Sequence, residues 1–389
     1  MRATTLPPRV LLSSADWRAR GVSSKRLAGR DLTTIFRGFS TPTAVPATVN
    51  TMCHVLQQVV VPGAVISHAT VAALMGIAIP WWIDNEIGKL SSAAYLSDSV
   101  LTIPSTLPVT PRSAGPEDGH MPPHWTERVE SGLPLRRDGR SYGPPRASNP
   151  LETPPLMHCR VEPGTQRSAG PHVVVHRTSA RPTFTYGGLE VSHPYVALLE
   201  LAGVLEHDDL VIAIDSLIAR RPRVTGAALE GIVAAAESYS GLWGAVPLRR
   251  ALADARPHTD SPGETRTRLL LGRAGFPEPV INLPVHDPHS GQMRYLDMAY
   301  PELKIAVEYD GDYHRRSKKQ WRQDQARKDS LASAGWDIRT LTGLDITSPA
   351  RLLSALRRTF RRLGASAPPE SNWSGRSEAR LGRSLGPPT

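Results

Sequence analysis

Two strand-like segments that carry acidic residues constrain the fold of this chain more than any other feature of its sequence. They read RYLDMAY at 294–300 and LKIAVEYD at 303–310. Alternating apolar residues predict a half-buried strand in each segment, and the residues between them, Pro301 and Glu302, predict a hairpin turn. This part of the chain therefore predicts an antiparallel strand pair within an α/β unit.

Charged side chains gather on one face of this predicted hairpin. The alternation of side chains along a strand places Lys304, Glu308 and Asp310 on the same face. Asp297 can face that side if the two strands pair in a suitable register. Carboxylates crowded in a half-buried sheet repel one another, and a divalent cation is the usual compensation. We therefore expect Mg²⁺ or Mn²⁺ to bind here, and carboxylates paired with nearby arginines are the structural alternative.

A capped helix precedes the hairpin. Residues 261–264 read SPGE, in which Ser261 caps the helix and Glu264 completes a capping box. Glu264 can bond back to the amide of Ser261, or it can join the acidic group as a further metal ligand. A metal ion held by carboxylates would suit phosphodiester hydrolysis, because it neutralises the phosphoryl oxygens and activates a water molecule.

A basic segment follows the hairpin. Residues 312–328 predict a helix whose cations could draw phosphate towards the carboxylates, or could form a solvated face. These cations are Arg315, Arg316, Lys318, Lys319, Arg322, Arg327 and Lys328. His314 could donate a proton to a leaving oxygen or could be a hydrogen-bonded structural residue. A strand at 336–341 and a helix beginning at Pro349 complete this α/β unit.

The start of the chain predicts a small helix-turn-helix. Residues 10–42 contain two short helical segments separated by Gly21, followed by a strand or wing at 32–39. Lys25 and Arg26 give this unit a basic face that could contact DNA phosphates, although such faces are often simply solvated.

Composition divides the rest of the chain. Segment 104–171 is rich in proline, glycine and arginine and poor in aliphatic residues, which predicts a disordered insertion. The flanking ranges 49–103 and 172–255 predict an α/β middle region with a strand at 172–178. The other expected regions are 1–48 for the helix-turn-helix, 256–364 for the acidic unit and 365–389 for a disordered tail.

Two polar residues of the middle region are predicted to be structural. Ser67 precedes an apolar run that stops at Gly76, so we expect it to cap a helix. Asp215 lies within the apolar run VIAIDSLI. A buried carboxylate that is satisfied by an arginine or a backbone donor is favoured there over a catalytic role.

The net charge favours a polyanionic partner. The 389 residues include 46 Lys and Arg against 36 Asp and Glu, for a net charge of +10, so DNA is the expected partner and RNA an open alternative. Cys53 and Cys159 form no CxxC pair, which argues against a disulfide framework or a cysteine-rich zinc site. The apolar run 69–83 is shorter than the roughly 20 residues of a membrane span. We therefore expect a cytoplasmic protein without a membrane segment.

Several front motifs resemble a known group of proteins. After the helix-turn-helix, the chain reads SHATVAALMGIAIP at 67–80, HVVVHR at 172–177 and LAGVLEHDDLVIAIDSLIAR at 201–220. This order resembles actinobacterial proteins with an AbiEi-type antitoxin-like N-terminal region. The resemblance implies a winged-helix DNA-binding module followed by an α/β region, and the proline-rich insertion departs from that compact pattern.

The acidic unit carries a more specific resemblance. The order SPGE, YLDMAYPELKIAVEYDGDYH, WRQDQARK and AGWDIRTLT is similar to domains related to the very-short-patch-repair endonuclease, within the PD-(D/E)XK superfamily. That resemblance implies metal-binding roles for Glu264, Asp297, Glu308 and Asp310. Asp310 stands where the superfamily has its lysine, which leaves Lys304 or Lys328 as substitutes. The repair enzyme's zinc-binding cysteines and its HGC element have no counterparts here.

Together these features predict an α/β multidomain protein with an N-terminal winged-helix-like region and a C-terminal restriction-endonuclease-like domain. The expected function is magnesium-dependent cleavage of DNA. The alternative is a non-catalytic DNA-binding regulator or antitoxin-like protein with a degenerate nuclease fold, and the missing motif lysine favours this alternative.

Overall fold

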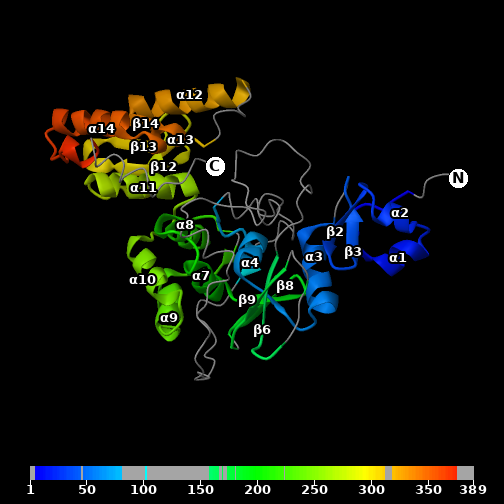
Figure 1. The fold of residues 1–389 in the computed structure, drawn as a ribbon. Coiled ribbons are helices and arrows are strands. Elements are labelled where there is room, and N and C mark those ends of the chain that lie inside the picture. The colour runs from blue at the N-terminus through cyan, green and yellow to red at the C-terminus, as the bar shows by residue number, and fades with distance from the viewer. Residues whose placement is uncertain are drawn as a thin grey trace. The chain divides into compact units, whose positions relative to one another are not determined.

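The computed structural model divides the chain into two compact units. The described residues are 5–44, 47–80, 101–102, 157–165, 169, 173–179, 181–222, 224–311 and 318–374. Unit 1 comprises Met1–Leu205 and Arg223–Arg249, and unit 2 comprises Glu206–Pro222 and Arg250–Thr389. The chain therefore passes between the units more than once, and Figure 1 labels the elements of both.

The N-terminal module of unit 1 combines two short helices with a small antiparallel sheet. Its elements are β1 (Leu12–Ser13), α1 (Ser14–Ala19), α2 (Ser24–Leu27), β2 (Leu32–Phe36) and β3 (Phe39–Pro42), with strand order β1-β3-β2. Trp17 packs with Val22 and Leu32, and its indole donates a hydrogen bond to the carbonyl of Ser40 at 3.0 Å. The two predicted helices are confirmed, and α2 is little more than one helical turn.

A five-stranded mixed sheet forms the centre of unit 1. Its strands are β4 (Val65–Ile66), β6 (Met157–Val161), β7 (Val173–Arg177), β8 (Thr183–Tyr186) and β9 (Leu189–Ser192), in the order β7-β6-β4-β9-β8. Strand β7 confirms the strand predicted at 172–178. Strand β6 shows that the prediction of disorder is wrong at residues 157–161, because β6 is fully buried and pairs with both β4 and β7. Residues 104–156 of the predicted insertion lie outside the described residues.

Helices of unit 1 pack with this sheet and with one another. They are α3 (Val49–Val55), η1 (Leu56–Val60), α4 (His68–Met75), α7 (Pro194–Ala202) and α9 (Leu229–Ser238), with the short parallel pair β5 (Leu101–Thr102) and β10 (Val224–Thr225). The division between the units falls within α10 (Ala245–Asp254). Helix α4 ends at Gly76 in the left-handed conformation, as predicted. Ser67 precedes α4 without a capping bond, and its hydroxyl instead lies 2.9 Å from Nδ1 of His68. Cys53 and Cys159 are both buried free thiols, as the sequence indicated.

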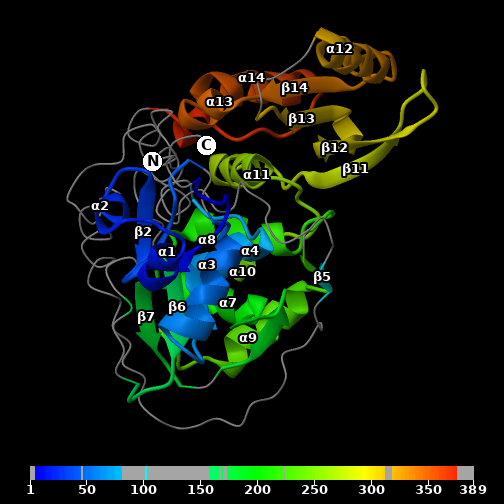
Figure 2. The same ribbon diagram turned by 90° about the vertical axis from the view of Figure 1, so that its right-hand side faces the viewer.

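Unit 2 contains a four-stranded mixed sheet with helices packed against it (Figure 2). The strands are β11 (Val280–His286), β12 (Met293–Tyr300), β13 (Ile305–Tyr309) and β14 (Asp337–Leu341), in that order across the sheet. The helices are α8 (His207–Leu217), α11 (Pro262–Ala274), α12 (Lys318–Ser333), α13 (Gly343–Thr347) and α14 (Ala350–Arg362), with the turns η3 (Pro301–Leu303) and η4 (Glu370–Asn372). Strands β11, β12 and β13 are antiparallel, and β14 runs parallel to β13. The predicted strands are confirmed.

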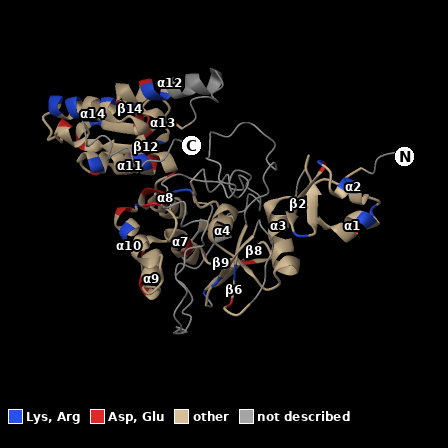
Figure 3. Cartoon of the chain, in the orientation of Figure 1, with Lys and Arg blue, Asp and Glu red and all other residues tan. Residues whose placement is uncertain are grey.

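Ion pairs fasten α8 to α11 within unit 2. The pairs are Arg266 with Asp209 at 3.3 Å, Arg268 with Asp215 at 2.9 Å and Arg273 with Asp208. Figure 3 marks the acidic residues of α8 in red. Asp215 also accepts hydrogen bonds from the amide of Arg256 and the hydroxyl of Thr265, which confirms the prediction of a satisfied buried carboxylate. These contacts group α8 with unit 2 and not with the middle region predicted at 172–255.

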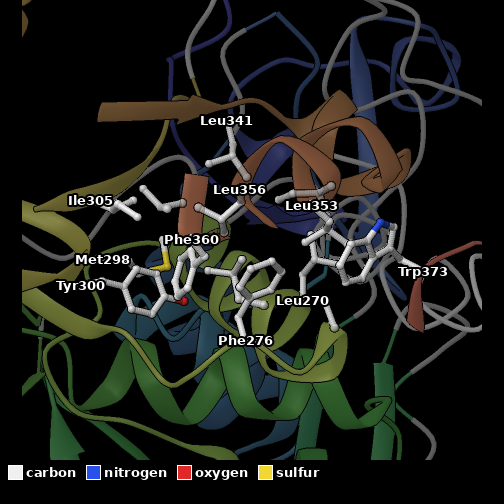
Figure 4. Close-up of a cluster of buried hydrophobic side chains, with 14 residues drawn as sticks. Leu270, Phe276, Met298, Tyr300, Ile305, Leu341, Leu353, Leu356, Phe360 and Trp373 are labelled. Carbon is white, nitrogen blue, oxygen red and sulfur yellow. The ribbon is translucent and has the colours of Figure 1, made fainter. Parts of the chain in front are cut away.

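Two hydrophobic clusters use opposite faces of the unit 2 sheet. Figure 4 shows the larger one, in which side chains of α11, α14 and the strands meet. Its labelled members are Leu270, Phe276, Met298, Tyr300, Ile305, Leu341, Leu353, Leu356, Phe360 and Trp373. The smaller cluster contains Leu296, Ala299, Ala306, Leu331 and Trp336. Ile305 and Ala306 are successive strand residues, so the two clusters lie on opposite sides of the sheet.

Part of the predicted disordered tail is packed on the larger cluster. Trp373 is 1% exposed, and its indole donates to the hydroxyl of Ser354 at 3.1 Å. The side chain of Asn372 donates to the carbonyl of Ala274 at 2.9 Å. The prediction of a tail from residue 365 is therefore wrong for residues 365–374, and residues 375–389 lie outside the described residues.

Among the described helices, none combines the length and the apolar character that a bilayer crossing requires.

Candidate active site

Regular strand pairing in unit 2 is interrupted at one level of the sheet. The ladder between β11 and β12 omits Asn282 and Asp297, although residues on either side of them are paired. Asn282 has a φ of 48°, in the left-handed region that strand residues rarely adopt. Leu296 belongs to the smaller hydrophobic cluster and Met298 to the larger, so side-chain alternation fails at Asp297. At this interruption the Asp297 side chain does not follow the alternation of side chains between the two faces of the sheet.

Asp297 reaches the backbone of the neighbouring strand. Its carboxylate accepts a hydrogen bond from the amide of Tyr309 at 2.9 Å. Burial raises the pKa of Asp297 to about 6, and the negative charges of Glu308 and Asp260 act in the same direction. The Tyr309 amide and the positive charge of Arg327 oppose that shift without cancelling it. Asp297 is therefore an acid with an unusually high proton affinity.

Glu264 approaches Asp297 from the first turn of α11. The hydroxyl of Ser261 caps the helix by accepting from the Glu264 amide at 3.2 Å. The Glu264 carboxylate accepts from the amide of Asp260 at 3.0 Å and from Asn282 at 3.5 Å, and not from the Ser261 amide that a capping box predicts. Burial raises the pKa of Glu264 to about 7, and the charge of Asp297 is the next contribution.

Two other carboxylates beside this pair are matched by arginines. Glu308, on β13, accepts a hydrogen bond from Arg327 of α12 at 2.6 Å. The same guanidinium donates to the carbonyl of Tyr295 at 3.1 Å, which fixes its position. Asp260 pairs with Arg220 at 2.5 Å, and Arg220 lies over the Tyr295 ring. The structural alternative of arginine pairing therefore holds for Glu308.

Glu264 and Asp297 differ from their neighbours in charge compensation. Within the described part of the chain, neither forms an ion pair with lysine or arginine. No group of three or more His, Cys, Asp or Glu side chains is arranged to hold a metal ion among these residues. Two carboxylates nevertheless fit Mg²⁺ or Mn²⁺ by donor chemistry, because Mg²⁺ commonly takes one or two protein carboxylates and completes its shell with water and phosphate.

Lys304 lies outside strand β13, although the sequence predicted it within that strand. It follows η3 with a φ of 52°, before β13 begins, and its ammonium lies 5.2 Å from the centroid of the Trp336 ring. Lys328, on α12, contacts the strand residue beside Glu308. Its ammonium donates to Thr340 at 2.9 Å, and Thr340 is the residue paired with Glu308 between β13 and β14. Of the two lysines proposed as substitutes, Lys328 is the one near the acids.

Some of the other predicted site residues lie within the described part of the chain, and some do not. Asp310 follows β13, is half-buried, and donates its amide to the carbonyl of Leu341 at 2.7 Å. His314, Arg315 and Arg316 lie outside the described residues. Lys318, Lys319 and Arg322 belong to α12, and their side chains also lie outside the described part. In unit 1, Lys25 is exposed, and Arg26 pairs with Asp31 at 2.6 Å.

Sequence reasoning missed the residues that complete this site. They are Arg220, Asp260, Asn282 and Thr340. Asn282 carried a local signal, because asparagine is disfavoured inside a strand such as VINLPV. The roles of Arg220 and Asp260 depend on a contact between segments far apart in the sequence. No local sequence pattern predicts that contact.

Unit 1 contains a polar cluster that the sequence did not predict. The rings of His68 and His176 stack with centroids 3.5 Å apart, and Nδ1 of His158 lies 3.1 Å from Nε2 of His176. The His68 amide donates to Glu200 at 3.0 Å, and Glu200 is buried beside Arg160 at 3.5 Å. Burial, followed by the charge of His158, lowers the pKa of His68 well below its usual range.

Comparison with known proteins gives relatives but no family. No family model matches the chain. Two uncharacterized proteins of Mycobacterium tuberculosis, from strains CDC 1551 / Oshkosh and ATCC 25618 / H37Rv, are each 27% identical over 200 residues. The matched region covers 51% of this chain and 72% of each relative. No solved structure matches.

Proposed function

We propose that unit 2 is a metal-dependent DNA endonuclease centred on Glu264 and Asp297. One observation carries this proposal. Two carboxylates meet at an interruption of the sheet without a cationic partner among the described residues, and their pKa values are raised to about 7 and about 6. A buried pair of this kind is destabilised when both groups are ionised, and a divalent cation is the natural compensation.

The distribution of acids over the elements supports the proposal. The PD-(D/E)XK resemblance implies an acid on a helix, an aspartate on one strand and a further acid on the next strand. Glu264 lies on α11, Asp297 on β12 and Glu308 on β13. Strands β12 and β13 are neighbours in the sheet, which supports a common site for Asp297 and Glu308.

Each residue would contribute separately to cleavage. Glu264 and Asp297 would hold Mg²⁺ or Mn²⁺, which when bound supplies charge neutralisation at the phosphoryl oxygens and a more acidic water. Arg327 fixes Glu308 beside the pair. Lys328 brings a positive charge to the adjacent strand, where it could attract a phosphate of the substrate. The proposal places this activity in the cytoplasm, and the buried free thiols Cys53 and Cys159 fit a reducing setting.

A second candidate function is favoured by the Arg327–Glu308 ion pair. The guanidinium already compensates one acid of the predicted ligand set at 2.6 Å. An acidic site neutralised by the protein's own arginine would have less need of a metal ion. In this second proposal the chain is a DNA-binding regulator or antitoxin-like protein that has lost cleavage.

Plasmid nicking with magnesium, and with magnesium plus chelator, tests the first proposal. Asp297→Asn and Glu264→Gln should each abolish magnesium-dependent cleavage, whereas the matched control Glu302→Gln changes an exposed acid and should cleave normally. Magnesium should also raise the melting temperature at pH 8 in wild type and the control, but not in the two site variants. Cleavage by Asp297→Asn at the wild-type rate would overturn the assignment. Salt-sensitive DNA binding without any cleavage would favour the regulator.

A further inference from the structure

Helix α14 carries a one-sided charge. Its sequence, ARLLSALRRTFRR, contains five arginines and neither an acidic residue nor a lysine. Leu353, Leu356 and Phe360 bury one side of the helix in the larger hydrophobic cluster. Figure 3 shows blue along α14 and no red on it. The arginines therefore occupy the side that the core leaves to solvent.

Most of these arginine side chains have no acceptor within the described part of the chain. Arg357 donates to the carbonyl of Pro368 at 3.0 Å, and Arg362 reaches Asp337 at 3.4 Å while 69% of its side chain stays exposed. The side chains of Arg351, Arg358 and Arg361 are exposed and make no hydrogen bond or ion pair with any described residue. Internal contacts therefore account for only part of the charge on this helix.

The spacing of the arginines forms a straight row. Arg351, Arg358 and Arg362 are seven and four residues apart, which places them on one face at separations of about 10 Å and about 6 Å. A row of roughly 16 Å matches the axial length of about five phosphates on one DNA strand. Arginine also suits this contact better than lysine, because its planar guanidinium binds phosphate through two parallel hydrogen bonds.

We infer that this arginine face of α14 docks the phosphate backbone of duplex DNA, as a contact surface separate from the acidic site. The inference rests on the proposed function, because it assigns a further surface for the same substrate. An anionic membrane fits less well, since the apolar side of α14 is buried in the core and cannot enter a bilayer. The positive charge of this face complements the negative charge of duplex DNA, and we therefore take DNA as the partner.

Fluorescence anisotropy of the full chain on a short DNA duplex, with chelator present to prevent cleavage, tests the inference. Arg351→Gln/Arg358→Gln should weaken binding on the order of 30-fold at 0.1 M salt and lower the slope of log K against log salt by about 2. The matched control Arg221→Gln/Arg250→Gln removes two exposed arginines of unit 2 whose side chains also lack an acceptor among the described residues, and should change binding less than about threefold. Arg351→Lys/Arg358→Lys should retain most of the salt slope.

The outcomes separate this inference from the proposed nuclease activity. Asp297→Asn should bind DNA normally, so loss of cleavage with retained binding concerns the acidic site alone. A wild-type protein that never cleaves, but loses binding in the Arg351/Arg358 variant, leaves the docking surface supported while the nuclease proposal fails. Unchanged binding in that variant, with unchanged thermal melting, overturns the inference. Equal losses in the two double variants, or tighter binding to RNA duplex or anionic vesicles than to DNA, also overturn it.

Discussion

Burial, followed by the charge of Asp297 on β12, raises the pKa of Glu264 on α11, at a place where neither side chain has an arginine partner among the described residues. Glu308 and Asp260, beside them, are both paired with arginine. The site is therefore electrostatically divided into a compensated half and an uncompensated half. Its uncompensated half should respond to protons and to cations.

The pH dependence of unit 2 stability follows from the raised pKa values. Folding raises the pKa of Asp297 to about 6 and of Glu264 to about 7, so the folded state holds these protons more tightly than the unfolded chain. Their stabilising contribution is complete below about pH 4 and is lost as pH rises to 7, by roughly 3 kcal/mol per group. Urea unfolding at several pH values should show this fall. The profile of Asp297→Asn should be flatter, and an equally steep profile would contradict the assignment.

Gly263 controls the approach of α11 to β13. A Cβ at this position would lie 2.0 Å from the ring of Tyr309, whose amide holds Asp297. Gly263→Ala should therefore destabilise unit 2 by about 1–3 kcal/mol and impair the site. Gly272→Ala lies in the same helix with nothing within 4 Å, and should be neutral or stabilising by up to about 1 kcal/mol. Thermal melting of both variants checks the pair, and equal effects would argue against the Tyr309 contact.

Removing only Asp215 from the buried pair Asp215–Arg268 should destabilise the protein more than removing both charges. Asp215→Ala leaves the Arg268 guanidinium buried without its partner, which should cost about 3–5 kcal/mol. Adding Arg268→Met removes the stranded charge, so the double variant should be more stable than Asp215→Ala alone. Chemical denaturation of the three proteins measures the difference. A double variant weaker than the single one would show that the guanidinium stabilises by packing alone.

Trp373 should be as important as a core residue of α14. It is 1% exposed within the larger cluster, so Trp373→Ala should lower the free energy of unfolding by about 3–5 kcal/mol. Leu344→Ala, at a position that is 75% exposed, is the matched control and should change it by less than about 0.5 kcal/mol. A small effect of Trp373→Ala in urea unfolding would contradict the packing of this segment.

Unit 1 should be sensitive to acid through His68. Its pKa in the folded state is well below the usual range, so the unfolded chain binds a proton that the folded unit excludes. The stability linked to this group is complete above about pH 6.5 and is lost as pH falls. His68→Asn suits the φ of 53° and removes the titrating ring, so it should flatten the profile between pH 7 and 5. An unchanged profile in circular-dichroism melts would implicate other groups.

Local patterns predicted the elements of unit 2 because period-two alternation and helix caps are visible in a single segment. The strands at 293–300, 305–309 and 337–341 follow from such patterns. Strand β6 was hidden because proline-rich composition around it outweighed its own alternation of apolar residues. Lys304 was predicted inside the strand, but it belongs to the connection between the strands, where it follows η3 in the left-handed conformation. The sequence does not show that this connection is longer than two residues.

Half of the candidate site could not be predicted for a different reason. Glu264 and Asp297 stood in recognisable local contexts, but Arg327 with Glu308 and Arg220 with Asp260 depend on how distant segments pack. The same holds for Trp373, whose burial requires the hydrophobic surface of α11 and α14. Whether a buried acid has an arginine partner depends on the tertiary fold. A sequence pattern indicates only which acids are expected to be buried.

The winding of the chain between the units sets a limit on how the protein can be divided. Helix α8 belongs to unit 2, although unit 1 residues flank it on both sides in the sequence. A fragment beginning at Arg250 would lack Asp208, Asp209 and Asp215, and would leave Arg266 and Arg268 buried without counterions. A single cut in the chain therefore cannot separate the two units without dividing one of them.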